Sequence, residues 1–120
     1  RRPPRSTLSS SSAASDVYKR QMGVYVLMTK LTPEVSGNLK GREAIGKAWK
    51  KMVDERCPDV RWLGHYALLG PYDFMDIYEA ASDETAAKVS MITRAGGALT
   101  AETWPALAWS RFTDLVQKLT

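Results

Sequence analysis

The chain contains little cysteine and little histidine: Cys57 is the only cysteine and His65 the only histidine among 120 residues. A single cysteine excludes a disulfide within the chain, and one histidine with one distant cysteine offers no convincing set of metal ligands. We therefore expect no metal and no cofactor. The lack of disulfides is also typical of proteins from the reducing cytoplasm, which is the location we expect.

Long apolar runs and known reaction motifs are missing as well. No stretch approaches the ~18 consecutive apolar residues of a membrane-spanning helix. No apolar segment follows the basic N-terminal residues as it would in a signal peptide. The sequence also has no glycine-rich phosphate loop and no nucleophile elbow. We expect no membrane association, and no motif assigns the protein to an enzyme class.

The net charge of +4 comes from the beginning of the chain. Residues 1–21 hold five of the 17 basic residues and one of the 13 acidic ones, so residues 22–120 are neutral overall. A nucleic-acid-binding protein concentrates Lys and Arg on its folded part. We therefore expect no nucleic-acid partner.

Residues 1–21 also differ from the rest in composition. They are rich in serine, lack periodicity and hold few sizeable apolar groups, so they cannot bury enough surface to offset the entropy of ordering. We expect a disordered tail. Its ending is similar to translated sequencing-adapter or assembly read-through and directly precedes Met22, the expected biological start. The alternative is a genuine flexible basic arm.

From Met22 onward, the hydrophobic pattern predicts alternating strands and helices. Strands are expected at residues 23–29, 60–69, 73–80 and 99–104, the last ended by Pro105. Helical regions are expected at residues 32–57, with a break near 37–41, at 82–95 and at 108–120.

Side-chain oxygens mark two helix starts, at Thr32 before Pro33 and at Ser82. Apolar residues at three-and-four spacing then predict a buried stripe on the first two helical regions and an amphipathic stripe on the C-terminal helix. The stripes are Ile45, Ala48, Trp49, Met52 and Val53, then Ala86, Val89 and Ile92, and finally Trp109, Phe112, Leu115, Val116 and Leu119.

The order β-α-β-β-α-β with a short C-terminal helix predicts an α+β, ferredoxin-like fold. In this fold both helices cover one face of a four-stranded antiparallel sheet, and the other face is bare. A bare face that carries aromatic side chains needs a partner or a ligand to cover it. We expect a homodimer that packs sheet against sheet, an arrangement known as a dimeric α+β barrel.

A tight turn at Gly70-Pro71-Tyr72 is expected to join the second and third strands, pairing Leu69 with Asp73 and Tyr66 with Asp76. Strand alternation then sorts the hairpin into two faces. One face is aromatic, with Trp62, Tyr66, Leu68, Phe74, Asp76 and Tyr78; the other holds Leu63, His65, Ala67, Leu69, Asp73, Met75, Ile77 and Glu79. We expect the second face under the helices and the aromatic face at an open cleft or dimer interface, although a one-residue slip in the loop would re-sort them.

Asp76 is the first candidate for chemistry. A carboxylate among aromatic rings is desolvated, which raises its pKa and suits it to proton transfer, and Tyr66 is expected to hydrogen-bond to it. His65 is the second candidate, because histidine is the side chain that changes charge near neutral pH. For both residues a purely structural role is the alternative. The expected ligand-binding residues are Tyr66, Trp62, Phe74, Tyr78 and Trp104, and Asp73 and Glu79 are interpreted as turn stabilisation and a surface ion pair.

Several segments resemble the GYD-domain family. They are Tyr25-Val26-Leu27 with Leu31-Thr32-Pro33-Glu34, Tyr66-Ala67-Leu68-Leu69-Gly70-Pro71-Tyr72-Asp73, Glu79-Ala80 with Asp83-Glu84, and Thr100-Ala101-Glu102-Thr103. The block that names the family stands here as Gly70-Pro71-Tyr72-Asp73. The resemblance implies a small bacterial ferredoxin-like domain of the dimeric α+β barrel type over residues 22–107, with no established activity. Asp76 departs from the mostly aliphatic residues expected there, and the helix at 108–120 extends beyond the family unit.

These features lead us to expect a dimer that binds a small apolar or aromatic molecule at the open sheet face. Cofactor-independent enzyme activity is a further option, in which Asp76 or His65 transfers a proton and Tyr66 orients the substrate. The alternative is a non-enzymatic dimeric module that binds a metabolite or a protein and has a regulatory role. Whether the protein is an enzyme is left open at this point.

Overall fold

The computed structural model of the protein describes residues 22–120. The expected disordered tail over residues 1–21, and with it the question of its origin, lies outside the described residues. The elements are β1 (Gly23–Leu31), α2 (Pro33–Gly37), α3 (Arg42–Arg56), β2 (Arg61–Ala67), β3 (Phe74–Ala80), α4 (Asp83–Ala95), β4 (Ala98–Ala106) and α5 (Trp109–Leu119).

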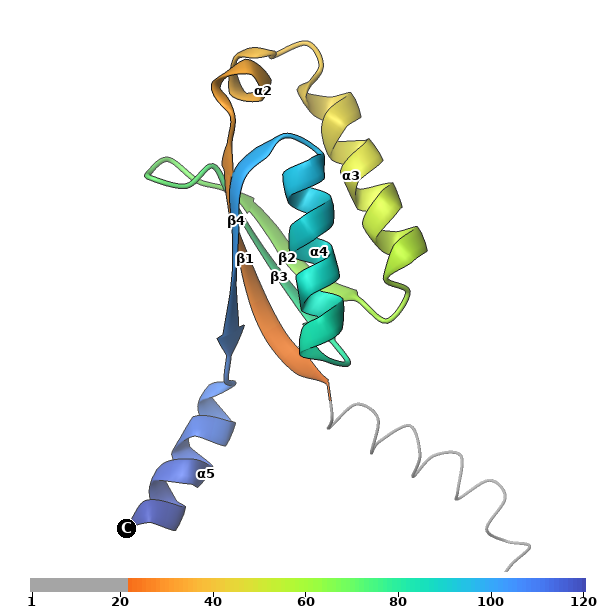
Figure 1. Cartoon of the computed structure of the whole chain (residues 1–120). Coiled ribbons are helices and arrows are strands. Elements are labelled where there is room, and N and C mark those ends of the chain that lie inside the picture. The colour runs from red at the N-terminus through yellow and green to blue at the C-terminus, as the bar shows by residue number, and fades with distance from the viewer. Residues whose placement is uncertain (1–21) are drawn as a thin grey trace, which may run out of the picture.

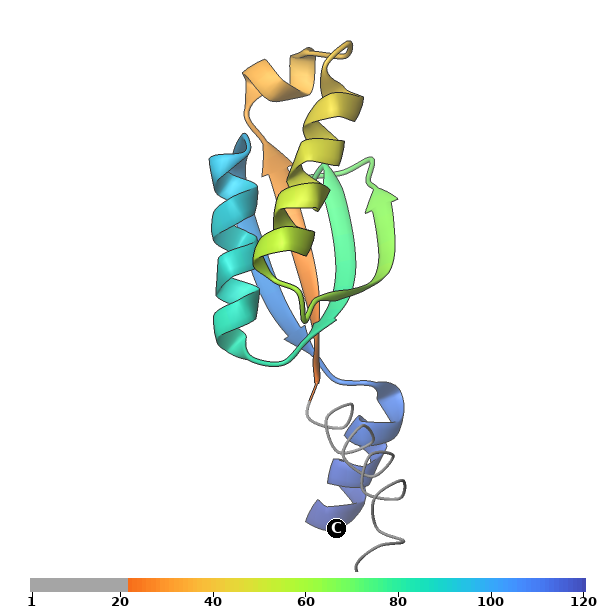
Figure 2. The same ribbon diagram turned by 90° about the vertical axis from the view of Figure 1, so that its right-hand side faces the viewer.

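The strands form one four-stranded antiparallel sheet in the order β2-β3-β1-β4. Helices α3 and α4 cover one face of this sheet, and the opposite face has no helix over it (Figure 1). This arrangement confirms the predicted α+β, ferredoxin-like fold. The C-terminal helix α5 does not join the two covering helices; it continues past the end of the sheet (Figures 1 and 2).

The predicted helix starts are confirmed, because both depend on local hydrogen bonds. Thr32 Oγ1 accepts the Val35 N–H (3.3 Å) and Pro33 opens α2, while Ser82 Oγ accepts the Thr85 N–H (3.3 Å) ahead of α4. The predicted break near residues 37–41 separates α2 from α3. After α4, Gly97 has a φ of 116°, and a Cβ there would lie 2.7 Å from Val35 Cγ2, so glycine is required for this turn.

The predicted end of the fourth strand at Trp104 is wrong, because β4 continues through Pro105 to Ala106. Proline cannot donate a backbone hydrogen bond, but β4 is an edge strand with only β1 beside it. A missing donor is tolerated at such an edge, where a central strand would lose a ladder hydrogen bond. Pro105 therefore lies opposite Tyr25 within the sheet.

The core lies between the sheet and the two covering helices. Its fully buried side chains include Leu27, Tyr78, Val53 and Val89. Helix α4 lies directly on β1, β3 and β4, because its inner face carries small side chains such as Ala86. Its predicted stripe is confirmed.

Helix α3 joins the core mainly through its C-terminal part. Val53 is buried there and Cys57 is buried directly after the helix ends. Towards the N-terminus of the helix, Ile45 and Trp49 are only half-buried. The two other residues of the predicted stripe, Ala48 and Met52, are exposed, so that stripe is confirmed only in part. The N-terminal half of α3 consequently packs less closely on the sheet than its C-terminal part.

The predicted register of the β2–β3 hairpin is wrong by one residue. The loop is longer than three residues. Ala67, the last residue of β2, pairs with Phe74, the first residue of β3, and beyond this pair Leu68 N–H donates to Asp73 O (2.9 Å). His65 rather than Tyr66 therefore lies opposite Asp76. A shift of register between Trp62 and Gly64 then adds one residue to β2.

The expected assignment of faces is consequently also wrong. Phe74, Asp76 and Tyr78 face the helices, and the bulge lets both Trp62 and His65 join them. Tyr66 lies opposite Met75 on the bare face. Aromatic rings thus lie on the helix-covered side of the sheet. Their grouping on one strand face had favoured an open cleft as the expected location.

Asp73 fastens the hairpin loop to the centre of the sheet. Its Oδ2 accepts the Leu31 N–H (2.8 Å), and its own N–H donates to Thr29 O (2.8 Å). The interpretation of Asp73 as turn stabilisation is thereby confirmed. Glu79, at the other end of β3, lies 3.9 Å from Arg61 Nε, as expected of a surface ion pair.

We predict that Asp73→Ala lowers the free energy of unfolding by about 1–3 kcal/mol, because the Leu31 N–H loses a charged acceptor. Asp73→Asn retains an acceptor oxygen and should lose less. Urea unfolding of the three proteins measures both differences. Equal stability of Asp73→Ala and the wild-type protein would contradict the anchoring role.

Candidate functional site

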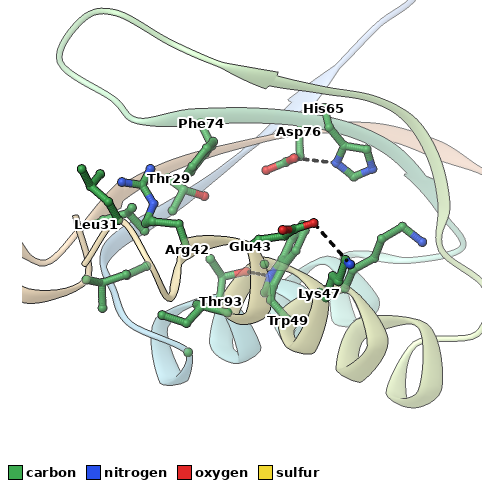
Figure 3. A pocket seen from close by; sticks show the side chains of 17 residues that line it. Thr29, Leu31, Arg42, Glu43, Lys47, Trp49, His65, Phe74, Asp76 and Thr93 are labelled. Atoms are coloured by element: carbon green, nitrogen blue, oxygen red, sulfur yellow. Dashed lines mark hydrogen bonds and ion pairs between the residues drawn. The ribbon is translucent and has the colours of Figure 1, made fainter. Parts of the chain in front are cut away.

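A pocket of about 750 Å³ lies between the N-terminal half of α3 and the helix-covered face of the sheet (Figure 3). This volume is within the range of small-molecule sites, roughly 300–1,000 Å³. The pocket exists because α3 reaches the core near its C-terminus and not along its whole length. Its walls come from all four strands, from α3 and α4 and from the α2 region, so distant parts of the chain meet there.

Most of the surface of the pocket wall is apolar, although polar and charged side chains also line it. The apolar side chains are Leu31, Val35, Leu39, Ile45, Trp49, Phe74 and Ala98. The polar and charged side chains are Thr29, Arg42, Glu43, Lys47, Lys50, His65, Asp76 and Thr93. A largely apolar surface with polar groups at defined positions is typical of sites that bind small organic molecules.

His65 and Asp76 form a hydrogen-bonded pair at the pocket wall. His65 Nδ1 lies 2.7 Å from Asp76 Oδ1 across the β2–β3 pairing (Figure 3). The two members differ in burial: the Asp76 side chain is 9% exposed, whereas 40% of the His65 side chain is accessible. The pair therefore consists of a buried carboxylate that holds an accessible imidazole.

Burial raises the pKa of the Asp76 carboxyl, and the hydrogen bond and charge of His65 act in the opposite, lowering direction. The sequence predicts the raised pKa of Asp76, but the predicted hydrogen bond from Tyr66 to Asp76 is wrong, because His65 is the partner. When Asp76 is ionised it can only accept, so His65 Nδ1 carries the donated proton. The other ring nitrogen, Nε2, then presents a lone pair and can accept a proton.

Two tryptophans hold the His65 ring in place. The centroid of the Trp62 ring lies 4.9 Å from that of His65, and the Trp49 ring lies edge-on at 6.2 Å. Each indole is itself fixed by a hydrogen bond: Trp49 Nε1 donates to Thr93 Oγ1 (2.9 Å) and Trp62 Nε1 donates to Asp54 Oδ1 (3.0 Å). The imidazole is thus oriented both by Asp76 and by rings whose own positions are set from α3 and α4.

Arg42 and Phe74 lie towards the other end of the pocket from His65 (Figure 3). The guanidinium carbon of Arg42 is 5.5 Å from the centre of the Phe74 ring, within the range of a cation–π interaction. Arg42 Nη1 also donates to Ser36 O (3.0 Å). The pocket therefore has a cationic group at one end and an imidazole–carboxylate pair at the other.

A separate polar cluster lies on the bare face of the sheet. Glu102 accepts hydrogen bonds from the Tyr72 hydroxyl (2.9 Å) and from Trp104 Nε1 (3.0 Å). The rings of Tyr72 and Trp104 also meet edge-on at 6.1 Å. The tyrosine of the Gly-Pro-Tyr-Asp block thus links the hairpin loop to β4, an interaction that the sequence did not indicate.

The structure separates the candidate residues of the sequence into three groups. His65, Asp76 and Phe74 line the pocket. Trp62 packs beside His65, and Tyr78 is fully buried in the core. Tyr66 and Trp104 lie on the bare face, 53% and 44% exposed.

Arg42 and Thr93 are among the pocket residues that sequence reasoning missed, and Trp49 was regarded only as core. No signal along the chain marks Arg42, because its role depends on Phe74, 32 positions later and on another element. Trp49 was recognisable as an inward-facing aromatic residue, but its place at a pocket wall depends on how α3 sits above the sheet.

Among residues 22–120, no group of three or more His, Cys, Asp or Glu side chains is placed to hold a metal ion. None of the helices in that range combines the length and apolar character needed to cross a membrane.

Comparison with known protein families gives one match. A family model described as the GYD domain matches residues 25–116, a range that begins in β1 and ends within α5. It includes the Gly-Pro-Tyr-Asp block and both His65 and Asp76. Comparison with curated proteins and with solved structures finds no match.

The raised pKa of Asp76 predicts a pH dependence of stability. Because the native pKa lies above the ordinary value of 3.8, the native state binds this proton more tightly than the unfolded chain does. The resulting stabilisation is complete below pH 3.8 and is lost as the pH rises through the native pKa. Asp76→Asn lacks this titration, so its stability relative to wild type should rise over that pH range.

Urea unfolding of both proteins at a series of pH values measures this difference. Asp114→Asn, on α5 and outside the pocket, controls for the loss of one negative charge. If the free energy of unfolding of Asp76→Asn, relative to that of wild type, stays constant or falls as the pH rises, the effect of burial on Asp76 is contradicted.

Proposed function

The chain belongs to the GYD-domain family, and we propose that it binds a small, largely apolar or aromatic molecule in the pocket between α3 and the sheet. The observation that carries this proposal is a pocket of about 750 Å³ with a hydrogen-bonded His65–Asp76 pair in its wall. The sequence led us to expect ligand binding at the open sheet face. The pocket supports a different location, beneath the helices.

The composition of the pocket wall supports the proposed ligand class. Trp49 and Phe74 present ring surfaces, and Leu31 and Ile45 add aliphatic surface. Flat aromatic ligands pack well against such rings, which contribute large contact areas at little entropic cost. The polar groups lie at defined positions and would orient the ligand, while most of the wall surface is apolar.

The His65–Asp76 pair supports cofactor-independent proton transfer as the reaction. His65 Nε2 would accept a proton from an acidic O–H or C–H group of the bound molecule. The buried Asp76 carboxylate would keep the other ring nitrogen protonated and stabilise the imidazolium that forms, as carboxylates do for catalytic histidines elsewhere. In this role His65 is the general base and Asp76 its positioning partner.

The alternative is a non-enzymatic dimeric module that binds a metabolite or a protein and has a regulatory role. The packing of His65 against Trp62 and Trp49 favours it, because a histidine held by aromatic rings and a carboxylate also has a structural use. In this version the pocket still binds a ligand, and His65 transfers no proton.

We further propose that the protein is a homodimer formed through the bare face of the sheet and through α5. On the bare face, Tyr66 and Trp104 are 53% and 44% exposed. On α5, every apolar side chain of the stripe is exposed, and the helix lies on the bare-face side beyond the end of the sheet (Figure 1). An 11-residue helix is marginal in water without packing partners.

A second copy of the chain is the occupant that fits these surfaces. Both apolar regions lie on the same side of the molecule, so one two-fold related partner would cover the sheet face and meet α5 at once. Stable interfaces bury roughly 800 Å² per partner. The bare sheet face, with several large side chains, and the stripe on α5 would both contribute to such an interface.

Filling the pocket should abolish ligand binding without unfolding the protein. Gly46 lines the pocket, and a Cβ there would meet nothing within 4 Å. Gly46→Leu should therefore block the uptake of an apolar dye such as Nile red. Gly46→Ala is the control, because both substitutions favour the helix by about 1 kcal/mol or less and alanine leaves most of the volume free. Dye fluorescence that is equal in both variants would place binding outside the pocket.

Deuterium exchange distinguishes the enzyme from the binding module. If His65 is a general base, an acidic C–H group of a ligand found by screening should exchange in heavy water in the presence of the protein. His65→Gln should abolish the exchange, and Gly46→Ala should retain it. NMR of the ligand measures the rate. A bound ligand with no exchange in the wild-type protein would favour the non-enzymatic alternative.

Light scattering during size exclusion tests the dimer. We expect twice the chain mass of 13.3 kDa at micromolar concentration, and dissociation in Phe112→Glu or Trp104→Glu, whose side chains are exposed in the single chain. Met91→Glu is the matched control, because Met91 is 68% exposed on α4, on the opposite side of the sheet. A wild-type monomer, or dissociation by Met91→Glu alone, would contradict the proposed interface.

A further inference from the structure

The charged side chains around the pocket pair with one another, with one exception. The pairs are Lys47 with Glu43 (3.3 Å), Lys50 with Asp54 (2.9 Å) and His65 with Asp76 (2.7 Å). Arg42 also lines the pocket, but no carboxylate of residues 22–120 lies within 4.0 Å of it. The pocket wall therefore contains one positive charge that the described residues do not compensate.

The guanidinium of Arg42 is held in place with most of its donors unused. Nη1 donates to Ser36 O (3.0 Å), and the Phe74 ring lies beneath the guanidinium carbon at 5.5 Å. A guanidinium has five N–H donors in a planar fork. Apart from the bond to Ser36, no hydrogen bond from this group is found within the described part of the chain. The remaining donors are thus available to a ligand at a position fixed by two contacts.

The geometry points to a ligand that carries a carboxylate, bound by Arg42, with its apolar or aromatic part lying between Phe74 and Trp49 towards His65. This inference rests on the proposed function of the pocket and names the chemical class of its ligand. The guanidinium fork matches a carboxylate in two parallel hydrogen bonds, which a compact ammonium group cannot do. The aromatic ring beneath Arg42 would continue the apolar surface for the rest of the molecule.

A cationic ligand fits the same pocket poorly. It would meet the charge of Arg42 at one end, and at the other end the Asp76 carboxylate is already paired with His65. Glu43 carries the other carboxylate of the wall, but it pairs with Lys47 and both side chains are largely exposed, 82% and 78%. A neutral ligand is accepted but leaves the donors of Arg42 unused. Acids are therefore expected to bind more tightly than alcohols or amines of the same shape.

Three probes of one shape and different charge test this inference: naphthylacetate, naphthylethanol and naphthylethylamine. We expect the acid to bind about tenfold more tightly than the alcohol, as a charged hydrogen-bonded pair would give, and the amine to bind least. NMR titration of the full-length protein measures the affinities. The Nε–H signal of Arg42 is identified by its loss in Arg42→Gln. This signal should shift when the acid is added, and not when the alcohol or the amine is added.

Variants at two arginines of α3 separate Arg42 from general charge effects. Arg42→Gln should remove the preference for the acid, while the affinity for the alcohol stays within about twofold. Arg56→Gln, at the other end of the helix and outside the pocket, makes the same change in net charge and should keep the preference.

Every other result contradicts either the carboxylate inference or the proposed function of the pocket. Equal binding of the three probes, or a preference that survives Arg42→Gln, overturns the carboxylate inference and leaves the proposed pocket function standing. A preference lost equally in Arg56→Gln also overturns it. Failure of all three probes to bind the folded protein overturns the proposed pocket function itself.

Discussion

The register between β2 and β3 is the constraint on which the site depends, because neighbouring side chains of a strand point to opposite faces of the sheet. The bulge between Trp62 and Gly64 lets both Trp62 and His65 face the helices. Without the extra residue, one of them would lie on the bare face. With it, the only histidine of the chain meets the buried carboxylate of Asp76 and is held from two sides by tryptophan rings. The loop that sets this register is in turn fastened to β1 by Asp73.

The pocket itself results from how the two helices rest on the sheet. Small inner side chains let α4 approach closely, whereas α3 reaches the core mainly through Val53 and leaves its first half above the strands. A space of this size contributes no packing energy, and sites that bind ligands commonly reduce stability in this way. Arg42 lies over Phe74 towards one end of this pocket, and the His65–Asp76 pair lies towards the other (Figure 3). The apolar surface that a single chain leaves bare, the open sheet face and α5, lies on the opposite side.

Features that depend on neighbouring residues could be predicted from the sequence. The starts of α2 and α4 follow from Thr32, Pro33 and Ser82, whose hydrogen bonds reach only three positions along the chain. Features set by partners far along the chain could not. Pro105 predicts the end of the fourth strand, but β4 continues through it, because an edge strand with a single neighbour tolerates proline. Asp76 was recognised as a desolvated acid from its aromatic surroundings, yet its partner was misassigned because a one-residue change in a loop alters every pair of the hairpin.

The sequence by itself determined the order of elements, the ferredoxin-like fold and the family, and it singled out His65 and Asp76 as candidates. These follow from composition, periodicity and short motifs, all of which act over a few positions. Only the tertiary structure decided that His65 and Asp76 are partners, that they face the helices, and that Arg42 lies over Phe74 in the same pocket. The physical reason is that register, bulges and the height of a helix above a sheet depend on packing between distant segments, for which the linear pattern contains no separate signal.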